Sequence, residues 1–508
     1  MIRIVNFTRV SAWAVLTLGS SLAAAQPDSL WEISSTEEWE AATQTSENLV
    51  FAENCATPTA SEATFESRVR YFPTKQRFGS MTIRQSPVWQ NWEPIPSVGP
   101  SNLVDAPVFL AKGLNDYWLF GLYDRHEGGK NGIGPIQHPP TFTAEAATLE
   151  GFHVPLVTTP YPNQFDAPGG LKPSLGGYHA WQSRDMVNWV HHGPVTEKFS
   201  RWVTTAEYAD GKTYIYYDYP NDQDPHVYID TDLTDGLPGN DQGIAFRDPS
   251  DGSDCAVIRS LAGDFHVIYE DWSPINAKAH SWDSPLAGHA VSEDGLGDFK
   301  ILAPAVDERT TPTGKTATYR HPHWLQHPDF DSNVVTYEIH EPAQDAYGDW
   351  AAICIGGQYY LFCDYHPVGG KIKIAWFTSD SLDQQFEFAG EIGQGHPDPD
   401  IGFAEGKFYL INQTKNDYVS PGPWVESVRA RVGVDTDRDG SINQWTDWQE
   451  VKESYEHIPG FAKQIRRIPA TLDLSSLPPA YGISFEIKIE DRTANPSLPL
   501  LDSIVISK

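Results

Sequence analysis

Apolar and polar positions along the chain alternate in short runs that are typical of β-strands. Such a run is followed by a turn containing Gly, Asn or Asp, and then by a second run rich in Tyr, Trp and Phe. Five segments share this form, namely residues 105–121, 204–219, 246–272, 348–366 and 395–411. Several are followed by an apolar–x–Ser–x–Asp pattern and a further strand, so a multi-stranded unit recurs along the chain.

The spacing of the turn glycines indicates the size of this unit. Gly211 and Gly263 lie 52 residues apart, and Gly357 and Gly406 lie 49 apart. Five four-stranded units of this length predict an all-β fold, a five-bladed β-propeller. A β-sandwich would need no such repeat. Two wider gaps, roughly residues 124–176 and 271–348, are expected to be long insertions on the active face.

The segments outside the repeat suggest a simple domain order. Residues 1–25 have the form of a signal peptide, with a basic start, an apolar run and Ala23-Ala24-Ala25 before the expected cleavage site. Residues 101–460 would form the propeller, and residues 26–100 a segment that wraps it. Residues 461–508 would be β-strands that close or flank the propeller. No later run is long enough to span a bilayer, so we expect a periplasmic or secreted protein.

Composition narrows the class of protein. The 508 residues include 68 acidic and 36 basic side chains, for a net charge of −32, which argues against binding to nucleic acid or to an anionic membrane. Hydrophobic residues make up 40%, enough for a large core. The four cysteines contain no C-x-x-C pair, which argues against a structural zinc site. Disulfides and buried thiols both remain open.

Polar residues stand near the start of each predicted innermost strand. They are Asp105, Glu207, Asp248, Asp349 and His396. In a propeller these strands surround one axis, so side chains at their starts would converge on one pocket. Acids also form turns at strand ends, but their recurrence in several blades favours a site.

Several of these residues lie in motifs that resemble those of the five-bladed propeller glycoside hydrolases, which include families 43, 32 and 117. The motifs are Asp105 in VDAP, Asp248 in FRDPS and His396 in Gly395-His396, and the resemblance covers about residues 100–450. It implies that Asp105 is the general base and that Asp248 tunes and orients the reacting groups. It also implies that His396 binds a central divalent metal ion. The Arg-Asp-Pro of the second motif is similar to family 32.

The fourth blade departs from the family 43 pattern, because no Glu-Gly-Pro is present. By register the acid position holds Asp349, but His340 and Glu341 upstream resemble the His-Glu pair of family 117. The resemblance favours His340 and Glu341 as the acid pair, with Asp349 as the alternative.

Glycoside hydrolysis needs one ionised and one protonated carboxyl group. Neighbouring side chains could shape the sugar site: Trp272, Trp324 and Trp350 could stack on sugar rings or fill blade cores. Arg247 could bind a hydroxyl or pair with Asp248.

A separate motif predicts a calcium site. Asp435, Asp437, Asp439, Gly440 and Asn443 follow the D-x-D-x-D-G pattern of calcium loops, although position twelve is not Glu. We expect a structural Ca²⁺ here, with an acidic hairpin turn as the alternative.

Together these features predict a secreted, exo-acting glycoside hydrolase. The resemblance to family 117 implies removal of terminal α-1,3-linked 3,6-anhydro-galactose from red-algal oligosaccharides, with inversion. It also implies a homodimer formed by exchange of N-terminal segments. The alternatives are a family-43-like arabinofuranosidase or xylosidase, and a non-catalytic glycan-binding propeller.

Overall fold

The computed structural model describes most of the chain. The described residues are 29–52, 54–86, 103–123, 164–165, 177–186, 188–197, 201–219, 225–246, 253–271, 286–306, 312–319, 337–342, 346–366, 373–392, 398–411, 419–421, 428–490 and 500–508. The predicted signal peptide lies outside them. Among the described residues, no helix is long and apolar enough to cross a membrane.

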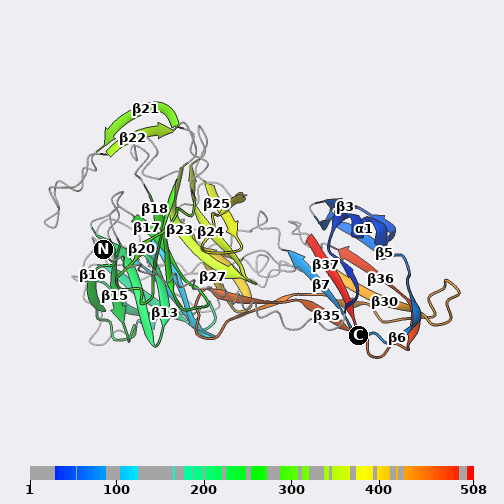
Figure 1. Cartoon of the computed structure of the whole chain (residues 1–508). Helices are drawn as coiled ribbons and strands as arrows, with labels where there is room; N and C mark the ends of the chain where they lie inside the picture. Colours follow the sequence, from blue (N-terminus) through cyan, green and yellow to red (C-terminus); the bar gives the residue numbers. More distant parts are fainter. Residues whose placement is uncertain are drawn as a thin grey trace, which may run out of the picture.

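Five mainly antiparallel sheets stand in a ring and form the larger unit, seen in Figure 1 mainly as the cyan, green and yellow strands. Blade 1 contains β8 (Leu103–Gly113), β9 (Asp116–Tyr123), β11 (Tyr178–Ser183), β12 (Trp189–Pro194) and the short β10 (Gln164–Phe165). Blade 2 contains β13 (Trp202–Ala209), β14 (Lys212–Asp218), β15 (Pro225–Asp230) and β16 (Asn240–Ile244). Blade 3 contains β17 (Ser253–Arg259), β18 (Phe265–Glu270), β19 (Ala287–Ser292) and β20 (Lys300–Ile301).

Blades 4 and 5 complete the ring. Blade 4 contains β23 (Ala346–Ile355), β24 (Gln358–His366), β25 (Lys373–Ser379) and β26 (Glu387–Ile392). Blade 5 contains β27 (Asp400–Ala404), β28 (Lys407–Ile411) and β29 (Val419–Pro421). The first strands contact one another in the order β8, β13, β17, β23, β27 and back to β8. The ring therefore closes, and the predicted five-bladed propeller is confirmed.

Aromatic strands fill the space between neighbouring blades. The second strand of blade 2, KTYIYYD, is buried at every position after Lys212, because its two faces pack against different blades. Blades 5 and 1 approach so closely that a Cβ added to Gly402 would lie 2.0 Å from Cδ1 of Phe109. Only glycine fits this contact, which is where the ring closes.

The smaller unit is a two-sheet β-sandwich built from both ends of the chain, and Figure 1 shows its blue N-terminal strands interleaved with orange and red C-terminal strands. One sheet contains β1 (Ser29–Ile33), β3 (Leu49–Ala52), β4 (Cys55–Pro58), β7 (Ser80–Ser86), β35 (Ala470–Asp473) and β37 (Leu500–Ser507). The other contains β2 (Thr43–Glu47), β5 (Glu62–Ser67), β6 (Arg70–Gln76), β30 (Val428–Asp435), β31 (Gln444–Trp445), β32 (Gln449–Glu450) and β36 (Ala480–Glu490). Helix α1 (Thr36–Ala42) lies beside them.

This sandwich differs from the predicted domain order. Residues 29–86 pair with residues 428–507 around one apolar core, instead of wrapping the propeller. In that core the rings of Phe65 in β5 and Phe485 in β36 stack with centroids 5.5 Å apart. The predicted C-terminal extension thus supplies β35, β36 and β37 of a second unit. Strands β30, β31 and β32, which were predicted within the propeller, belong to that unit as well.

The segment that links the two units closes one end of the propeller axis. It comprises β33 (Ser454–His457), residues 458–463 and β34 (Gln464–Ile468), and β34 pairs with β23 in parallel. It forms hydrogen bonds with the first strands of blades 2 to 5. His457 Nε2 bonds with the carbonyl of Phe403, the Lys463 ammonium donates to Thr205 and Val257, and the Lys463 carbonyl accepts the N–H of Cys354. Ala462 belongs to the same apolar cluster as Val108 and Leu110 of blade 1. We call residues 457–464 the axial plug.

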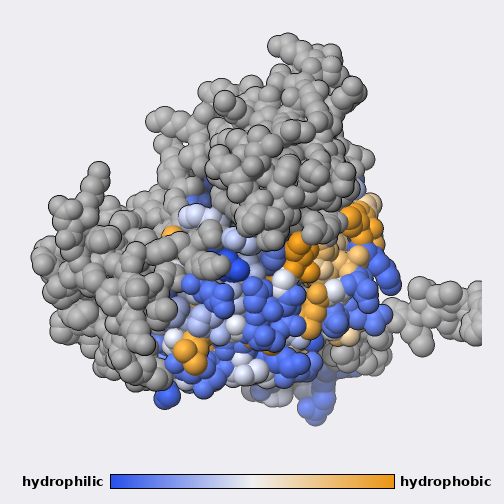
Figure 2. All heavy atoms as spheres, turned by 90° about the vertical axis from the view of Figure 1, so that its left-hand side faces the viewer, coloured by the Kyte–Doolittle hydropathy of each residue, from blue (hydrophilic) through white to orange (hydrophobic). Residues whose placement is uncertain are grey.

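None of the four cysteines forms a disulfide, and Cys255, Cys354 and Cys363 are buried. This agrees with the buried-thiol interpretation. The described surface in Figure 2 is mostly hydrophilic, with small apolar patches, as a net charge of −32 would suggest. A hairpin of β21 (Pro312–Tyr319) and β22 (Tyr337–Pro342) belongs to neither unit's sheets.

Candidate active site

Backbone irregularities mark the end of the axis where the first strands begin. The pairing register shifts between Ser253 and Ala256 in blade 3, and between Gly348 and Ala351 in blade 4. The acids there have left-handed backbones, with φ of +41° at Asp254 and +51° at Asp349; Asp398, just before β27, has φ of +55°. Aspartate tolerates this conformation better than most residues. We call this end the acid end.

Each of these three acids is tied to the preceding blade by the same hydrogen bond. The backbone N–H of Asp254 donates to Oδ2 of Asp218 over 3.0 Å, and that of Asp398 donates to Oδ1 of Asp364 over 2.8 Å. The N–H of Asp349 donates to Oε1 of Glu270 over 3.1 Å. All three acceptor side chains are buried and lie at or near the end of a second strand. Carboxylates from neighbouring blades therefore gather around the axis.

Electrostatics single out Asp349 within this group. Burial raises the pKa of Asp349 well above its usual range, and the negative charges of Asp398, Asp254, Asp364 and Glu270 raise it further. A carboxyl group in these surroundings keeps its proton to a higher pH than an exposed one. A general acid needs a proton retained in this way.

One oxygen each of Asp349, Asp364 and Asp398 lie within 4.8 Å of one another. Three carboxylates at this spacing could share a proton or hold a hard divalent cation such as Ca²⁺. His396, the predicted ligand of a central ion, lies outside the described residues. A chelator would remove a bound cation but would not affect a shared proton, so it distinguishes these two alternatives.

The structure brings only some of the predicted residues to the acid end. Asp105 lies in β8, where the register shifts between Val104 and Val108, and so occupies the position of blade 1 that corresponds to Asp349. His340 and Glu341 lie in β22, paired with Thr316 and Lys315. Besides His396, four predicted residues fall outside the described part of the chain: Asp248, Arg247, Trp272 and Trp324.

Two expectations need correction. Trp350 is only 2% exposed and packs in the core against Tyr347 and Phe377, so it does not offer a face to a sugar. Glu207 does not join the acid end either. The irregularity of blade 2 falls at Thr204, and Glu207 lies further along β13, deeper in the axis.

Sequence reasoning missed most of the acids that do meet. Asp254 and Asp398 occupy the blade positions that it gave to Asp248 and His396. The acceptors Asp218, Glu270 and Asp364 were not singled out. A signal was present, because each follows a run of aromatic and apolar residues at or near the end of a strand, in the patterns YIYYD, HVIYE and YYLFCD.

A second charged group lies deeper in the axis than the acids described above. Burial raises the pKa of Asp400 to about 6 and also raises that of Glu207, while the positive charge of Lys463 lowers both. The Lys463 ammonium donates to Thr205 Oγ1 over 3.0 Å and to the carbonyl of Val257 over 2.8 Å. This lysine of the axial plug is therefore the counter-charge for two buried acids.

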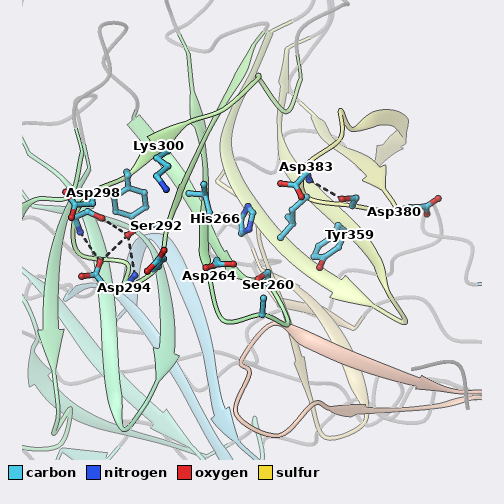
Figure 3. Close-up of a pocket in the computed structure, with 17 residues that line it drawn as sticks. Ser260, Asp264, His266, Ser292, Asp294, Asp298, Lys300, Tyr359, Asp380 and Asp383 are labelled. Carbon is cyan, nitrogen blue, oxygen red and sulfur yellow. Dashed lines mark hydrogen bonds between the residues drawn. The ribbon is translucent and has the colours of Figure 1, made fainter. Parts of the chain in front are cut away.

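A cavity of about 1090 Å³ lies between blades 3 and 4, at the hairpins opposite the acid end (Figure 3). Acids line it, including Asp264, Asp294 and Asp383. The carboxylate of Asp294 accepts the N–H groups of Leu296 and Gly297. Its acids thus include residues that shape local turns, and the cavity is separate from the acid end.

The predicted calcium loop lies in the sandwich. One oxygen each of Asp435, Asp437 and Asp439 lie within 4.8 Å of one another, a donor set that suits Ca²⁺. Gly440 has φ of +94°, which the sharp turn requires. Burial would raise the pKa of Asp435, but hydrogen bonds from Tyr71 and from three backbone N–H groups hold it below its usual value.

Asn443 closes the loop from its far side. Its Oδ1 accepts the N–H of Thr436 over 2.6 Å and lies 3.0 Å from Thr436 Oγ1. Its part in binding Ca²⁺ stays a prediction.

Comparison with known proteins adds little to this description. No protein family matches the chain, and no curated protein matches it. Similar solved structures include an alpha-L-arabinofuranosidase from Clostridium thermocellum, at 12% identity over 72% of this chain and 95% of that chain, with a TM-score of 0.34. Cellvibrio cellulosa alpha-L-arabinanase complexed with arabinohexaose has 12% identity over 72% and 95%, with a TM-score of 0.36.

An exo-beta-1,3-galactanase from Phanerochaete chrysosporium, complexed with beta-1,3-galactotriose, has 9% identity over 84% of this chain and 100% of that chain, with a TM-score of 0.36. Similarities this low do not carry an argument. The propeller rests instead on the closed ring of first strands, and any function must be argued from the acid end.

Proposed function

We propose that the protein is a glycoside hydrolase whose catalytic acids lie at the acid end of the propeller. One observation carries the proposal: the half-buried carboxyl group of Asp349 faces carboxylates of blades 3, 4 and 5, and its pKa is raised well above the usual range. The glycoside as substrate comes from the motifs around Asp105, Asp248 and His396, which resemble those of propeller glycoside hydrolases. That part is an argument from resemblance.

In the proposed mechanism Asp349 is the general acid. It keeps a proton near neutral pH and donates it to the oxygen of the departing sugar. Asp105, at the corresponding position of β8, is the proposed general base that activates water. Attack by this water from the opposite face of the ring would invert the anomeric carbon. His340 and Glu341 remain the second candidate for the acid.

The axial plug supports action on chain ends. Residues 457–464 form hydrogen bonds with the first strands of blades 2 to 5, and Ala462 shares an apolar cluster with β8 of blade 1. A polysaccharide could therefore not thread through the axis. A sugar that enters from the acid end meets a closed floor. We therefore propose that the enzyme removes terminal sugars.

The proposed substrate is an oligosaccharide ending in α-1,3-linked 3,6-anhydro-galactose, from agar or carrageenan. This rests on the resemblance of His340-Glu341 to family 117, and an arabinofuranosidase or xylosidase is the alternative. Secretion through the predicted signal peptide belongs to the same proposal. So does a structural Ca²⁺ in the loop of Asp435.

The test is mass spectrometry of products formed from defined agar, carrageenan, arabinan and xylan oligosaccharides. The wild type is expected to release one terminal sugar, and Asp349→Asn and Asp105→Asn should each abolish release. Release of a pentose would support the alternative substrate. Binding to one oligosaccharide without release would favour a glycan-binding propeller and contradict the proposal.

A further inference from the structure

The three hydrogen bonds between blades at the acid end are one repeated device. In each, the donor is the backbone N–H of an acid with positive φ, and the acceptor is a buried carboxylate of the preceding blade. For Asp349 the acceptor is Glu270, the last residue of β18. Glu270 is 1% exposed, so water does not compete for this bond.

This hydrogen bond gives the backbone N–H of Asp349 an acceptor that the sheet does not provide. At the irregularity between Gly348 and Ala351 the chain leaves the ladder with β24, and the N–H of Asp349 loses its usual partner there. A buried N–H must find another acceptor. A left-handed aspartate is also unfavourable and persists only where its surroundings hold it. Glu270 supplies the acceptor for the N–H of Asp349, and this hydrogen bond also stabilises the left-handed backbone of Asp349.

We propose that Glu270 is a positioning residue that fixes the backbone of Asp349, and thereby directs the Asp349 carboxyl group toward the axis. The catalytic part of this inference rests on the proposed function. Glu270 need not touch the substrate, since it acts through the N–H of the next blade.

The kinetic test compares Glu270→Gln with Glu270→Ala. The Gln side chain keeps an oxygen that can accept the N–H of Asp349, whereas Ala does not. We expect Glu270→Ala to lower kcat about 100-fold with KM within about threefold, because a small misplacement of a catalytic group is costly. Glu270→Gln should stay within about tenfold of the wild type. A Gln variant as inactive as Asp349→Asn would overturn the inference.

The control is Asp230→Ala. Asp230 is also a buried carboxylate that accepts a backbone N–H, from Asp232 over 2.7 Å, but it ends β15 at the end of blade 2 opposite the acid end. Its loss should lower stability and leave kcat unchanged. If Asp230→Ala lowers kcat as much as Glu270→Ala does, the effect is one of general stability and the inference fails.

A second readout does not depend on activity. Amide hydrogen exchange in peptides covering residues 346–351 should be at least about tenfold faster in Glu270→Ala than in the wild type, and unchanged in Glu270→Gln. Unchanged exchange in Glu270→Ala would overturn the inference even if the wild type hydrolyses no glycoside. If the Ala variant does not fold, the Gln variant decides, because altered exchange there contradicts the inference.

Discussion

Removal of the Lys463 ammonium should destabilise the propeller strongly. Lys463 is 5% exposed and donates two hydrogen bonds, to Thr205 and Val257. It also offsets the buried charges of Glu207 and Asp400. Loss of one partner from a buried charged group costs about 3–5 kcal/mol. We therefore expect Lys463→Met to lower the free energy of unfolding of the propeller by about that amount at pH 8.

The loss of stability caused by Lys463→Met should depend on pH, because the protonation of the buried acids decides how much counter-charge they need. Burial raises the pKa of Asp400 from 3.8 to about 6, so Asp400 favours folding below its unfolded pKa and loses that contribution as pH rises through the folded pKa. Without Lys463 the folded pKa rises further. At pH 5 the acid is then mostly neutral and needs no counter-charge. Lys463→Met should cost clearly less at pH 5 than at pH 8.

The assay is urea unfolding of both proteins at the two pH values, with the slope compared to confirm that the same surface unfolds. Lys373→Met is the matched control, because Lys373 pairs with Glu391 at the exposed edge of blade 4. Such surface pairs contribute less than about 1 kcal/mol. A cost for Lys463→Met below about 1 kcal/mol at pH 8, or equal at both pH values, would refute the role given to Lys463.

Three further predictions concern other parts of the molecule. Asp349→Asn should lower kcat by about 100-fold or more, and the wild type should lose activity as pH rises through the raised pKa of Asp349; a pH profile unchanged by the variant would contradict this. A chelator should lower the thermal stability of the sandwich, measured by calorimetry, and leave kcat unchanged; loss of kcat that Ca²⁺ restores would instead place a cation among the axial carboxylates. Gly402→Ala should destabilise the propeller by about 1–3 kcal/mol in urea unfolding, because its Cβ would lie 2.0 Å from Cδ1 of Phe109. An unchanged midpoint of unfolding would show that blades 5 and 1 can move apart to admit the methyl group without a loss of stability.

Local pattern predicted the propeller because each blade is formed by consecutive strands. A turn glycine and an aromatic strand mark every unit, and the pairing partners lie within a few tens of residues. The sandwich left no comparable signal, since β5 (Glu62–Ser67) pairs with β36 (Ala480–Glu490). Neither segment can show in its own sequence which distant strand covers it.

The acid end was predictable in outline but not residue by residue. Aspartates occur at positions 248, 251 and 254 before the first strand of blade 3, and motif resemblance drew attention to Asp248. What identifies Asp254 is its backbone φ and its bond to Asp218. Both depend on how two blades meet, which a linear pattern does not record. Trp350 shows the same limit, because nothing in its neighbours distinguishes a core ring from an exposed one.

Because strands from the two ends of the sequence interleave in the sandwich, the sandwich can be completed only after the blades have been synthesised. In one sheet of the sandwich, β37 (Leu500–Ser507) lies between β4 and β7, which come from the first 86 residues. Those early strands cannot complete their sheet until residues 500–507 have left the ribosome. The blades, made of consecutive strands, can form earlier during translation. The axial plug is synthesised after all five blades, so the propeller is closed on one side only after its blades have been made.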